Sequence, residues 1–342
     1  MKLSQFIHLG DLLRSWLSSQ ITLPLLDRAI EDGFCLNPYF TPYMQKNAID
    51  AICKQFLDRN VLESVIKEYP FVCEGSELSF VNCEGKAVGV VAAGNIPAVA
   101  FQDIFSALLV GASVVVKLSS KDKFLLPAIF SFIEINNDVQ TIKFVDNAEF
   151  VLGSYDALLT MGGDKAAKYF STIFKGIPSI VRKNRYSVAV VRGDETKEDL
   201  WALAKDITLY YGLGCRSVSF LLLPNAYDIG VLAKIVEECT LSIMTPFFKR
   251  NYLRNKTIDI MDGEDIIDAG GFYFVRNNLA VHKVSSVGYK FYERISEVDE
   301  FVKNESEHLQ RVYYSFGKAQ TPGLADFPDG EDIFLFLKNK LL

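Results

Sequence analysis

The sequence has few residues of the kinds that bind metal ions or form disulfides. It contains only three histidines, and none of them lies in a motif that indicates catalysis: His8, His282 and His308. Its six cysteines are scattered and include no CxxC pair: Cys35, Cys53, Cys73, Cys83, Cys215 and Cys239. A zinc site or a disulfide framework is therefore not expected, and most of the cysteines should be small buried apolar residues.

Long apolar runs and an excess of positive charge are also missing. No apolar stretch reaches the roughly eighteen residues needed to cross a bilayer. The net charge is −6, and no basic patch is interleaved with aromatic residues, which argues against a nucleic-acid-binding protein. Acidic and polar residues interrupt residues 1–30, so we expect no cleaved signal peptide and place the protein in the cytoplasm.

The chain also lacks the GxGxxG pattern of many dinucleotide-binding domains, yet residues 86–120 predict a strand, a turn, a helix and a second strand. The apolar run over residues 87–92 predicts a buried strand, Pro97 should lie near the first turn of the helix, and the second strand should end at Lys117. Parallel strands joined in this way end at one edge of a sheet. We therefore expect Asn95 and Lys117 at the carboxyl edge, where such sheets bind ligands.

The remaining pattern predicts an α/β protein with two domains. Residues 1–70 have helical periodicity, and from residue 71 to 185 strands and helices alternate, as in a doubly wound sheet. One of these strands should precede Gly162 and Gly163, which lead into another helix. We expect a helical segment and a dinucleotide-binding domain over residues 1–185, with the tail 318–342 packing on it, and a catalytic domain over 186–317.

The second domain should contain a helix over residues 197–211 that leads into the sequence Gly212-Leu213-Gly214-Cys215 and then a buried strand. Residues 242–270 show poor periodicity and are expected to form loops beside the substrate. The pattern predicts further strands over residues 187–193, 218–223, 271–276, 280–284, 290–295 and 311–316, and further helices over 231–239 and 298–304.

These motifs resemble the aldehyde dehydrogenase superfamily, and in particular the fatty acyl-CoA reductases related to the bacterial luminescence reductase. The resemblance is carried by the Asn95-Ile96-Pro97 turn, by the strand that ends in Lys117-Leu118-Ser119-Ser120, and by the Gly-x-Gly-Cys turn at Cys215. The superfamily holds its nicotinamide cofactor without the GxGxxG loop. The resemblance implies an aldehyde-dehydrogenase-like fold with a Rossmann-type cofactor domain and an α/β catalytic domain.

The resemblance implies a catalytic role for Cys215 and Asn95. Cys215 would be the nucleophile, and its backbone N–H would point at the developing oxyanion, to which the Asn95 side chain would donate a second hydrogen bond. Alternatively, Asn95 caps the following helix, or does both. Hydrolytic members have a Glu-Leu-Gly-Gly segment upstream of the thiol, whose glutamate activates water. The corresponding residues 181–186 contain no carboxylate, so the resemblance points to an acylating, CoA-linked enzyme.

The same resemblance implies a set of cofactor contacts. Lys117, with Ser119 and Ser120, would reach the adenosine ribose, and Gly162 and Gly163 would bring a helix N-terminus to the pyrophosphate. The alternatives are a solvated lysine at a strand end and an ordinary glycine turn.

The residue at position 120 favours NADPH over NADH. Members that prefer NAD often have a glutamate where this chain has Ser120, and Lys121 and Lys123 follow it. A carboxylate would bind the ribose hydroxyls and repel a 2′-phosphate, whereas a serine with nearby cations should accept one.

The sequence therefore predicts an NADPH-dependent reductase that converts a fatty acyl-CoA, or an acyl-carrier substrate, into an aldehyde, with CoA as leaving group and no metal. A rival is an acyl-phosphate or semialdehyde reductase, because the basic run Arg182 to Arg185 would suit an anionic substrate, although it would equally suit CoA phosphates. A third hypothesis is a non-catalytic partner subunit that binds acyl groups. Acyl chain length, the general acid and assembly into a homo-oligomer stay open.

Overall fold

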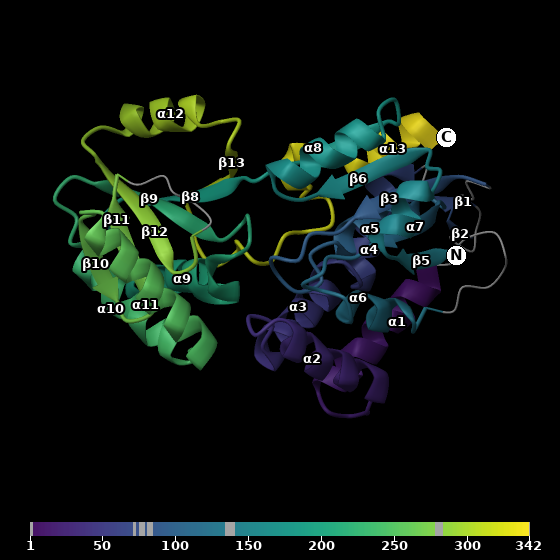
Figure 1. The fold of residues 1–342 in the computed structure, drawn as a ribbon, viewed down its shortest axis with the longest axis horizontal. Helices are drawn as coiled ribbons and strands as arrows, with labels where there is room; N and C mark the ends of the chain where they lie inside the picture. Colours follow the sequence, from purple (N-terminus) through teal and green to yellow (C-terminus); the bar gives the residue numbers. More distant parts are fainter. Residues whose placement is uncertain are drawn as a thin grey trace. The chain divides into compact units, whose positions relative to one another are not determined.

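The computed structural model describes residues 3–70, 73–74, 79–80, 85–133, 141–277 and 283–341. The chain folds into two compact units, each with a sheet of its own (Figure 1). Unit 1 comprises Met1–Lys183 and Pro322–Leu342, and unit 2 comprises Asn184–Thr321.

Four helices form the N-terminal part of unit 1, in agreement with the helical periodicity of residues 1–70. Thr41 caps one of them by accepting a hydrogen bond from the Met44 N–H, and Pro42 occupies its first turn. Asp58 caps the next helix in the same way. The first helix packs on the third, and the second on the third and on α6 (Leu125–Phe130). The four helices are α1 (Leu3–Leu17), α2 (Pro24–Leu36), α3 (Pro42–Gln55) and α4 (Arg59–Glu68).

The main sheet of unit 1 has five parallel strands in the order β5-β4-β3-β6-β7. Its central strands are valine- and leucine-rich and largely buried, as expected of a parallel sheet with helices on both faces. The strands are β3 (Ala87–Val91), β4 (Ser113–Lys117), β5 (Ile142–Val145), β6 (Ala157–Met161) and β7 (Ser179–Arg182). A separate antiparallel pair is formed by β1 (Cys73–Glu74) and β2 (Ser79–Phe80).

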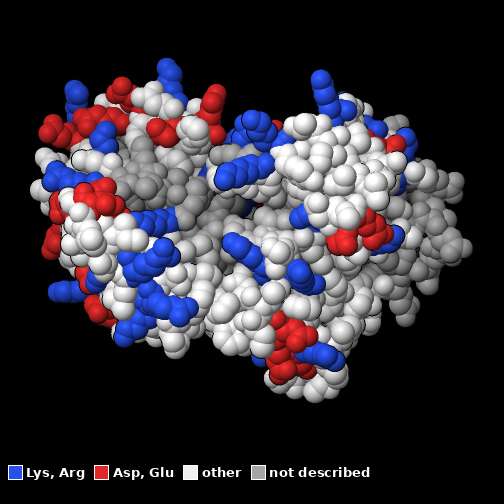
Figure 2. Space-filling view, in the orientation of Figure 1, with Lys and Arg blue, Asp and Glu red and all other residues white. Residues whose placement is uncertain are grey.

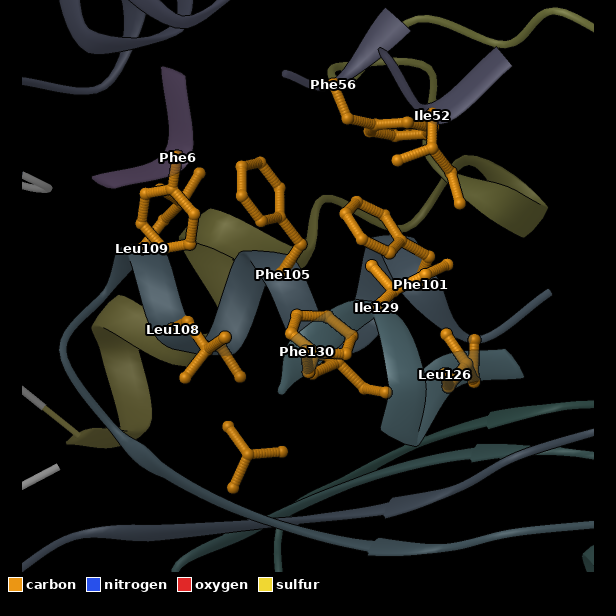
Figure 3. Close-up of a cluster of buried hydrophobic side chains, with 14 of the residues drawn as sticks. Phe6, Ile52, Phe56, Phe101, Phe105, Leu108, Leu109, Leu126, Ile129 and Phe130 are labelled. Atoms are coloured by element: carbon orange, nitrogen blue, oxygen red, sulfur yellow. The ribbon is translucent and has the colours of Figure 1, made fainter. Parts of the chain in front are cut away.

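Helix α5 (Phe101–Leu109) is the central element of the unit 1 core, because all its residues are buried. Figure 3 shows it between the sheet and the N-terminal helices. Phe101 stacks on Phe130 of α6 at 5.2 Å between ring centroids, and Phe105 meets Phe6 of α1 edge-on at 4.8 Å. The aromatic contacts fix the helix that directly follows the Asn95 turn.

The remaining helices of unit 1 cover both faces of the sheet. The neighbouring strand residues Leu158 and Leu159 belong to different apolar clusters, because alternate side chains of a strand point to opposite faces. Leu159 shares its cluster with the C-terminal helix, and Leu158 shares the other with Phe150 and Phe170. These helices are α7 (Asn147–Leu152), α8 (Asp164–Ile173) and α13 (Ile333–Leu341), which follows the short 3₁₀ helix η3 (Pro328–Gly330).

Unit 2 is built around a six-stranded sheet in the order β10-β11-β12-β9-β8-β13. Among its described strands, only β10 runs antiparallel to its neighbour. The strands are β8 (Tyr186–Val190), β9 (Val218–Pro224), β10 (Ile266–Ala269), β11 (Phe272–Arg276), β12 (Ser286–Tyr292) and β13 (Leu309–Tyr313). The helices are α9 (Lys197–Thr208), the 3₁₀ helix η2 (Leu209–Gly212), α10 (Ile229–Leu241), α11 (Pro246–Met261) and α12 (Ile295–Asn304).

The prediction of loops over residues 242–270 is wrong. Helix α11 and strand β10 occupy most of this segment. The helix starts at Pro246 behind a Thr245 cap, whose hydroxyl accepts a hydrogen bond from the Phe248 N–H at 3.2 Å. Its apolar residues are spread around the helix, with Phe248 buried and Met261 exposed, so no single apolar stripe marks it in the sequence.

Two predicted helix ends also differ from the structure. Helix α5 begins at Phe101 rather than at Pro97, and α9 ends at Thr208 rather than at Tyr211. Both differences come from residues with left-handed backbone angles, which cannot continue an α-helix. The strand expected over residues 280–284 lies partly outside the described residues, and β12 begins earlier than the strand expected over 290–295.

Both signs of charge occur on the visible face of each unit (Figure 2). In the described part of the chain, no helix is long and apolar enough to cross a membrane.

Candidate functional site

Three adjacent strands of unit 1 bring the predicted cofactor residues to one edge of its sheet. Val91 of β3 pairs in parallel with Lys117 of β4 and with Thr160 of β6. The Ala92 N–H continues this pairing by donating to the Lys117 carbonyl at 3.0 Å. Lys117 ends β4, and the loops that carry Asn95 and Gly162 follow β3 and β6, so all three residues lie at the carboxyl edge, as the sequence predicts for Asn95 and Lys117.

Asn95 lies in a turn that touches the loop after β4 on both sides. A Cβ atom on Gly94 would lie 2.3 Å from the Ser119 Oγ, so only glycine allows this approach. Beyond Asn95, the Ala98 N–H donates to Asp122 Oδ2 at 2.8 Å. The N-cap of α5 is Ala100, so Asn95 does not occupy the N-cap position that the alternative interpretation gave it.

Asp122 contacts the Asn95 turn and was not predicted from the sequence. Its side chain is buried, and burial raises its pKa to about 6, while the hydrogen bond from the Ala98 N–H opposes this increase. Sequence offers little signal for it, because an aspartate between Lys121 and Lys123 resembles an ordinary solvated loop residue.

Lys117 is a half-buried cation near an aromatic ring. Its Nζ lies 5.8 Å from the centre of the Phe170 ring of α8 and donates a hydrogen bond to the Leu118 carbonyl at 3.3 Å. No carboxylate pairs with it among the described residues. Burial lowers the pKa of the Lys117 amine, which leaves an ammonium group able to gain from an incoming oxygen ligand.

The turn at Gly162 and Gly163 leads directly into α8. Gly163 is the N-cap and supplies no side chain to the backbone N–H groups of the first turn. A Cβ atom on Gly162 would lie 3.0 Å from the Ala166 Cβ, so the turn packs tightly on the helix. A helix start of this kind can receive a phosphate group.

Cys215 lies in a tight turn of unit 2, between α9 and β9. The Ser217 N–H closes this turn on the Gly214 carbonyl at 3.0 Å. The Cys215 carbonyl accepts a hydrogen bond from the Ser187 hydroxyl of β8 at 2.9 Å, and the Ser217 hydroxyl accepts one from Gln320 at the same distance. Cys215 is half-buried, forms no disulfide with a described residue, and lies in a turn whose backbone is held by these hydrogen bonds.

The backbone before this turn has an unusual conformation that the sequence does not reveal. Tyr210, Tyr211 and Gly212 all have left-handed angles, with φ of 55°, 56° and 70°. Two consecutive tyrosines in this region are strained, and the surrounding contacts must hold them there. The Tyr211 hydroxyl donates to the Ile243 carbonyl at 2.8 Å, and its ring stacks on Phe248 at 4.4 Å.

The structure changes the interpretation of the basic run from Arg182 to Arg185. Arg182 is buried and forms an ion pair with Asp103 of α5 at 2.6 Å. Arg185 is half-buried and donates to the Leu309 carbonyl at 3.1 Å. Lys183 is exposed, so the run presents one exposed cation rather than the cluster that would favour an anionic substrate.

Other candidate residues for chemistry are dispersed. No cluster of ligands in the described residues could hold a metal ion. His8 and His308 are exposed, and His282 lies outside the described residues. Of the other cysteines, Cys35 is exposed, and burial raises the pKa of the Cys53 and Cys239 thiols.

Comparison with known families identifies the chain. A family model described as acyl-CoA reductase (LuxC) matches residues 41–238, which is more than half of the sequence. The chain belongs to this acyl-CoA reductase family. The family predicted from the motifs is thus confirmed, and the protein is an oxidoreductase of acyl-CoA or aldehyde groups. No sequence among the curated proteins matches the chain.

Solved structures of aldehyde dehydrogenases share the fold. Aldehyde dehydrogenase 21 from Physcomitrella patens, in complex with succinate, has a TM-score of 0.68 at 8% identity, covering 100% of this chain and 85% of its own. Indole-3-acetaldehyde dehydrogenase AldA from P. syringae has a TM-score of 0.61 at 12% identity, and the match covers 91% of this chain and 75% of AldA. An NAD⁺ complex of an aldehyde dehydrogenase from Bacillus cereus has a TM-score of 0.63 at 13% identity, and the match covers 92% of this chain and 76% of that protein. The acyl-CoA reductase therefore has the aldehyde dehydrogenase fold, with a Rossmann-type domain.

Proposed function

We propose that the protein uses NADPH to reduce a fatty acyl-CoA thioester to an aldehyde through a covalent acyl-cysteine intermediate. The observation that carries the proposal is the Cys215 turn, in which a half-buried cysteine follows a strained backbone segment in a member of the acyl-CoA reductase family. Residues 1–185 with the tail 318–342 would bind the dinucleotide, and residues 186–317 would carry the thiol.

The chemistry assigned to the protein's own residues is nucleophilic catalysis. The Cys215 thiolate attacks the thioester carbonyl, and the C–S bond to CoA breaks, so that CoA leaves as a thiolate. The Asn95 amide and the Cys215 backbone N–H stabilise the negative charge on the carbonyl oxygen, and one such donor contributes about 3 kcal/mol. After reduction, the thiohemiacetal oxyanion collapses, releasing the aldehyde and restoring the Cys215 thiolate.

The carboxyl edge of the unit 1 sheet fits a nicotinamide dinucleotide. Lys117 offers a partly desolvated cation without a carboxylate partner among the described residues, and Ser119 and Ser120 follow it. The start of α8 at Gly163 offers backbone N–H groups to a pyrophosphate. When bound, the cofactor supplies the hydride. The AldA and Bacillus cereus neighbours are complexes with NAD⁺, which supports the same class of cofactor here.

The preference for NADPH rests on the loop after Lys117. Ser120, Lys121 and Lys123 are all exposed in this loop. The described loop residues include one carboxylate, Asp122, but it is buried and bonded to the Ala98 N–H. Two exposed cations and no exposed carboxylate favour a 2′-phosphate on the ribose.

Residues 181–186 favour exchange of the acyl-enzyme with CoA over its hydrolysis by water. This segment has no carboxylate to activate water, so the acyl-enzyme should hydrolyse slowly. The rival acyl-phosphate or semialdehyde reductase loses the support of an exposed basic run, because Arg182 is paired with Asp103. The acyl donor in this proposal is an acyl-CoA or an acyl-carrier protein, and the protein acts in the cytoplasm. Either a monomer or a homo-oligomer is compatible with this function.

The proposal is tested by NADPH consumption with acyl-CoAs of increasing chain length. We expect turnover that peaks at one chain length, is lost in Cys215→Ala and persists in Cys239→Ala. Cys239 is a matched control because, like Cys215, it is a half-buried cysteine of unit 2. Turnover by the Cys215 variant would overturn the proposal. If the folded protein binds NADPH but reduces no acyl-CoA, the substrate would instead be an acyl-phosphate or an acyl-carrier protein. If NADPH does not raise the melting temperature, the protein would be a non-catalytic partner subunit.

A further inference from the structure

The turn that carries Asn95 contains a backbone conformation that needs support. Ala98 has a φ of 54°, which a residue with a side chain rarely adopts. Its carbonyl accepts the Phe101 N–H at 2.9 Å, so it lies at the joint between the turn and α5. Strained residues persist only where neighbouring groups hold them, and they occur preferentially at functional sites.

Asp122 is the group that holds this joint. Its Oδ2 accepts the Ala98 N–H at 2.8 Å, and both residues are at most 5% exposed. Without that acceptor, the buried N–H would lack a bond, and the turn could relax to a less strained conformation.

The loop of Asp122 is itself well fixed. The Asp122 N–H donates to the Ser119 carbonyl, and the Lys121 N–H donates to the Ser119 hydroxyl, both at 3.2 Å. Ser119 also packs directly against Gly94. The Asn95–Pro97 segment is therefore held at both ends by one short loop, which starts where β4 ends.

We propose that Asp122 is a positioning residue, which fixes the Asn95 turn so that the Asn95 amide can donate to the oxyanion. This inference rests on the proposed function of Asn95. Asp122 also connects the Asn95 turn to the proposed cofactor contacts, because its loop contains Ser119 and Ser120.

The test is a double-mutant cycle on acylation alone. The full-length protein is mixed with an acyl-CoA in the absence of NADPH, and the burst of CoA thiol is followed in a single turnover. We expect Asn95→Ala to slow acylation by about 10²–10³-fold. We expect Asp122→Ala to slow it by about tenfold or more, because displacement of a donor by a fraction of an ångström weakens it.

The combined variant distinguishes positioning from general damage to the fold. If Asp122 acts through Asn95, the Asn95→Ala/Asp122→Ala protein should be no slower than Asn95→Ala. Asp122→Asn, which keeps an acceptor oxygen, should remain within about twofold of the wild type. If Asp122→Ala does not fold, Asp122→Ser replaces it, because its hydroxyl is one atom too short to reach the same N–H.

Asp156→Ala is the matched control. Asp156 Oδ2 accepts the Ala87 N–H at 2.9 Å, which is the same kind of bond at the opposite end of β3. This variant should acylate at the wild-type rate. A wild-type rate in Asp122→Ala, or effects that multiply in the double variant, would overturn the positioning role while leaving Asn95 in place. A wild-type rate in Asn95→Ala would overturn both that role and the oxyanion function itself.

Discussion

Arg182 at the end of β7 and Asp103 in the first turn of α5 form a buried ion pair, with 2.6 Å between Nη1 and Oδ2. The two side chains are 5% and 1% exposed. The guanidinium Nε and Nη2 and the Asp103 Oδ1 have no hydrogen-bond partner among the described residues. The pair therefore joins the central helix to the sheet in a medium where an unpaired charge is costly.

Removal of one partner should destabilise the protein strongly. We expect Asp103→Ala to lower the free energy of unfolding by about 3–5 kcal/mol, because it leaves the Arg182 charge buried without a counterion. The double variant Asp103→Leu/Arg182→Met should recover most of this loss, since it removes both charges. Urea unfolding of the purified proteins measures both values.

The control for this pair is Lys86→Ala, which removes an ion pair with Asp156 whose side chains are 42% and 31% exposed. We expect a change of at most about 1 kcal/mol, because exposed pairs contribute little. Equal losses in Asp103→Ala and Lys86→Ala would contradict the argument from burial.

One added negative charge at position 120 should reverse the preference for NADPH over NADH. In Ser120→Glu we expect the NADPH dissociation constant to rise by about tenfold or more, because a carboxylate beside the ribose repels a 2′-phosphate. NADH binding should stay unchanged or improve. Lys117→Met should instead weaken the binding of both NADPH and NADH. Fluorescence titration with each cofactor measures this ratio, and an unchanged ratio in Ser120→Glu would exclude this loop as the determinant.

The strained backbone before Cys215 should depend on its aromatic anchor. Tyr211→Phe removes the hydroxyl, and with it the hydrogen bond to the Ile243 carbonyl, and should lower stability by about 1 kcal/mol. Tyr211→Ala also loses the stacking on Phe248 and should cost about 3–5 kcal/mol. We expect the alanine variant to change the alkylation rate of Cys215 by iodoacetamide, whereas the phenylalanine variant should not. Identical alkylation in all three proteins would mean that this anchor does not shape the thiol turn.

Asp122 should make stability depend on pH in a defined direction. Its pKa is raised to about 6 by burial, so the native state holds a proton that the unfolded state has lost. The contribution of Asp122 to wild-type stability should therefore fall as pH rises from about 4 to about 6. Asp122→Asn does not titrate, so its stability relative to wild type should increase over this range by about 2–3 kcal/mol. Urea unfolding at several pH values tests this, and a constant difference would contradict the raised pKa.

The sequence predicted the parts of the fold that depend on local pattern. The valine run of β3 and the helical periodicity of residues 1–70 both reflect burial, and the order and spacing of apolar residues in a sequence show burial directly. The parallel pairing of Val91 with Lys117 follows from the crossover through α5.

The features that sequence did not reveal depend on contacts between distant residues. The start of α5 is displaced to Phe101 because Asp122 holds Ala98 in a left-handed conformation. The end of α9 is displaced because Tyr211 is anchored to Ile243 and Phe248. Neither pairing leaves a trace in local composition. The same holds for Arg182, which looks like part of an exposed basic run until Asp103 is placed beside it.

The most direct test of the account is to look for the acyl-enzyme itself. The wild-type protein, Cys215→Ala and Cys239→Ala are each incubated with a long-chain acyl-CoA without NADPH, and the intact masses and peptides are measured. We predict one acyl group per chain, attached to Cys215 and removed by hydroxylamine or by NADPH, in the wild type and in Cys239→Ala alone. An acyl group on another residue, or its persistence in Cys215→Ala, would contradict the proposed mechanism.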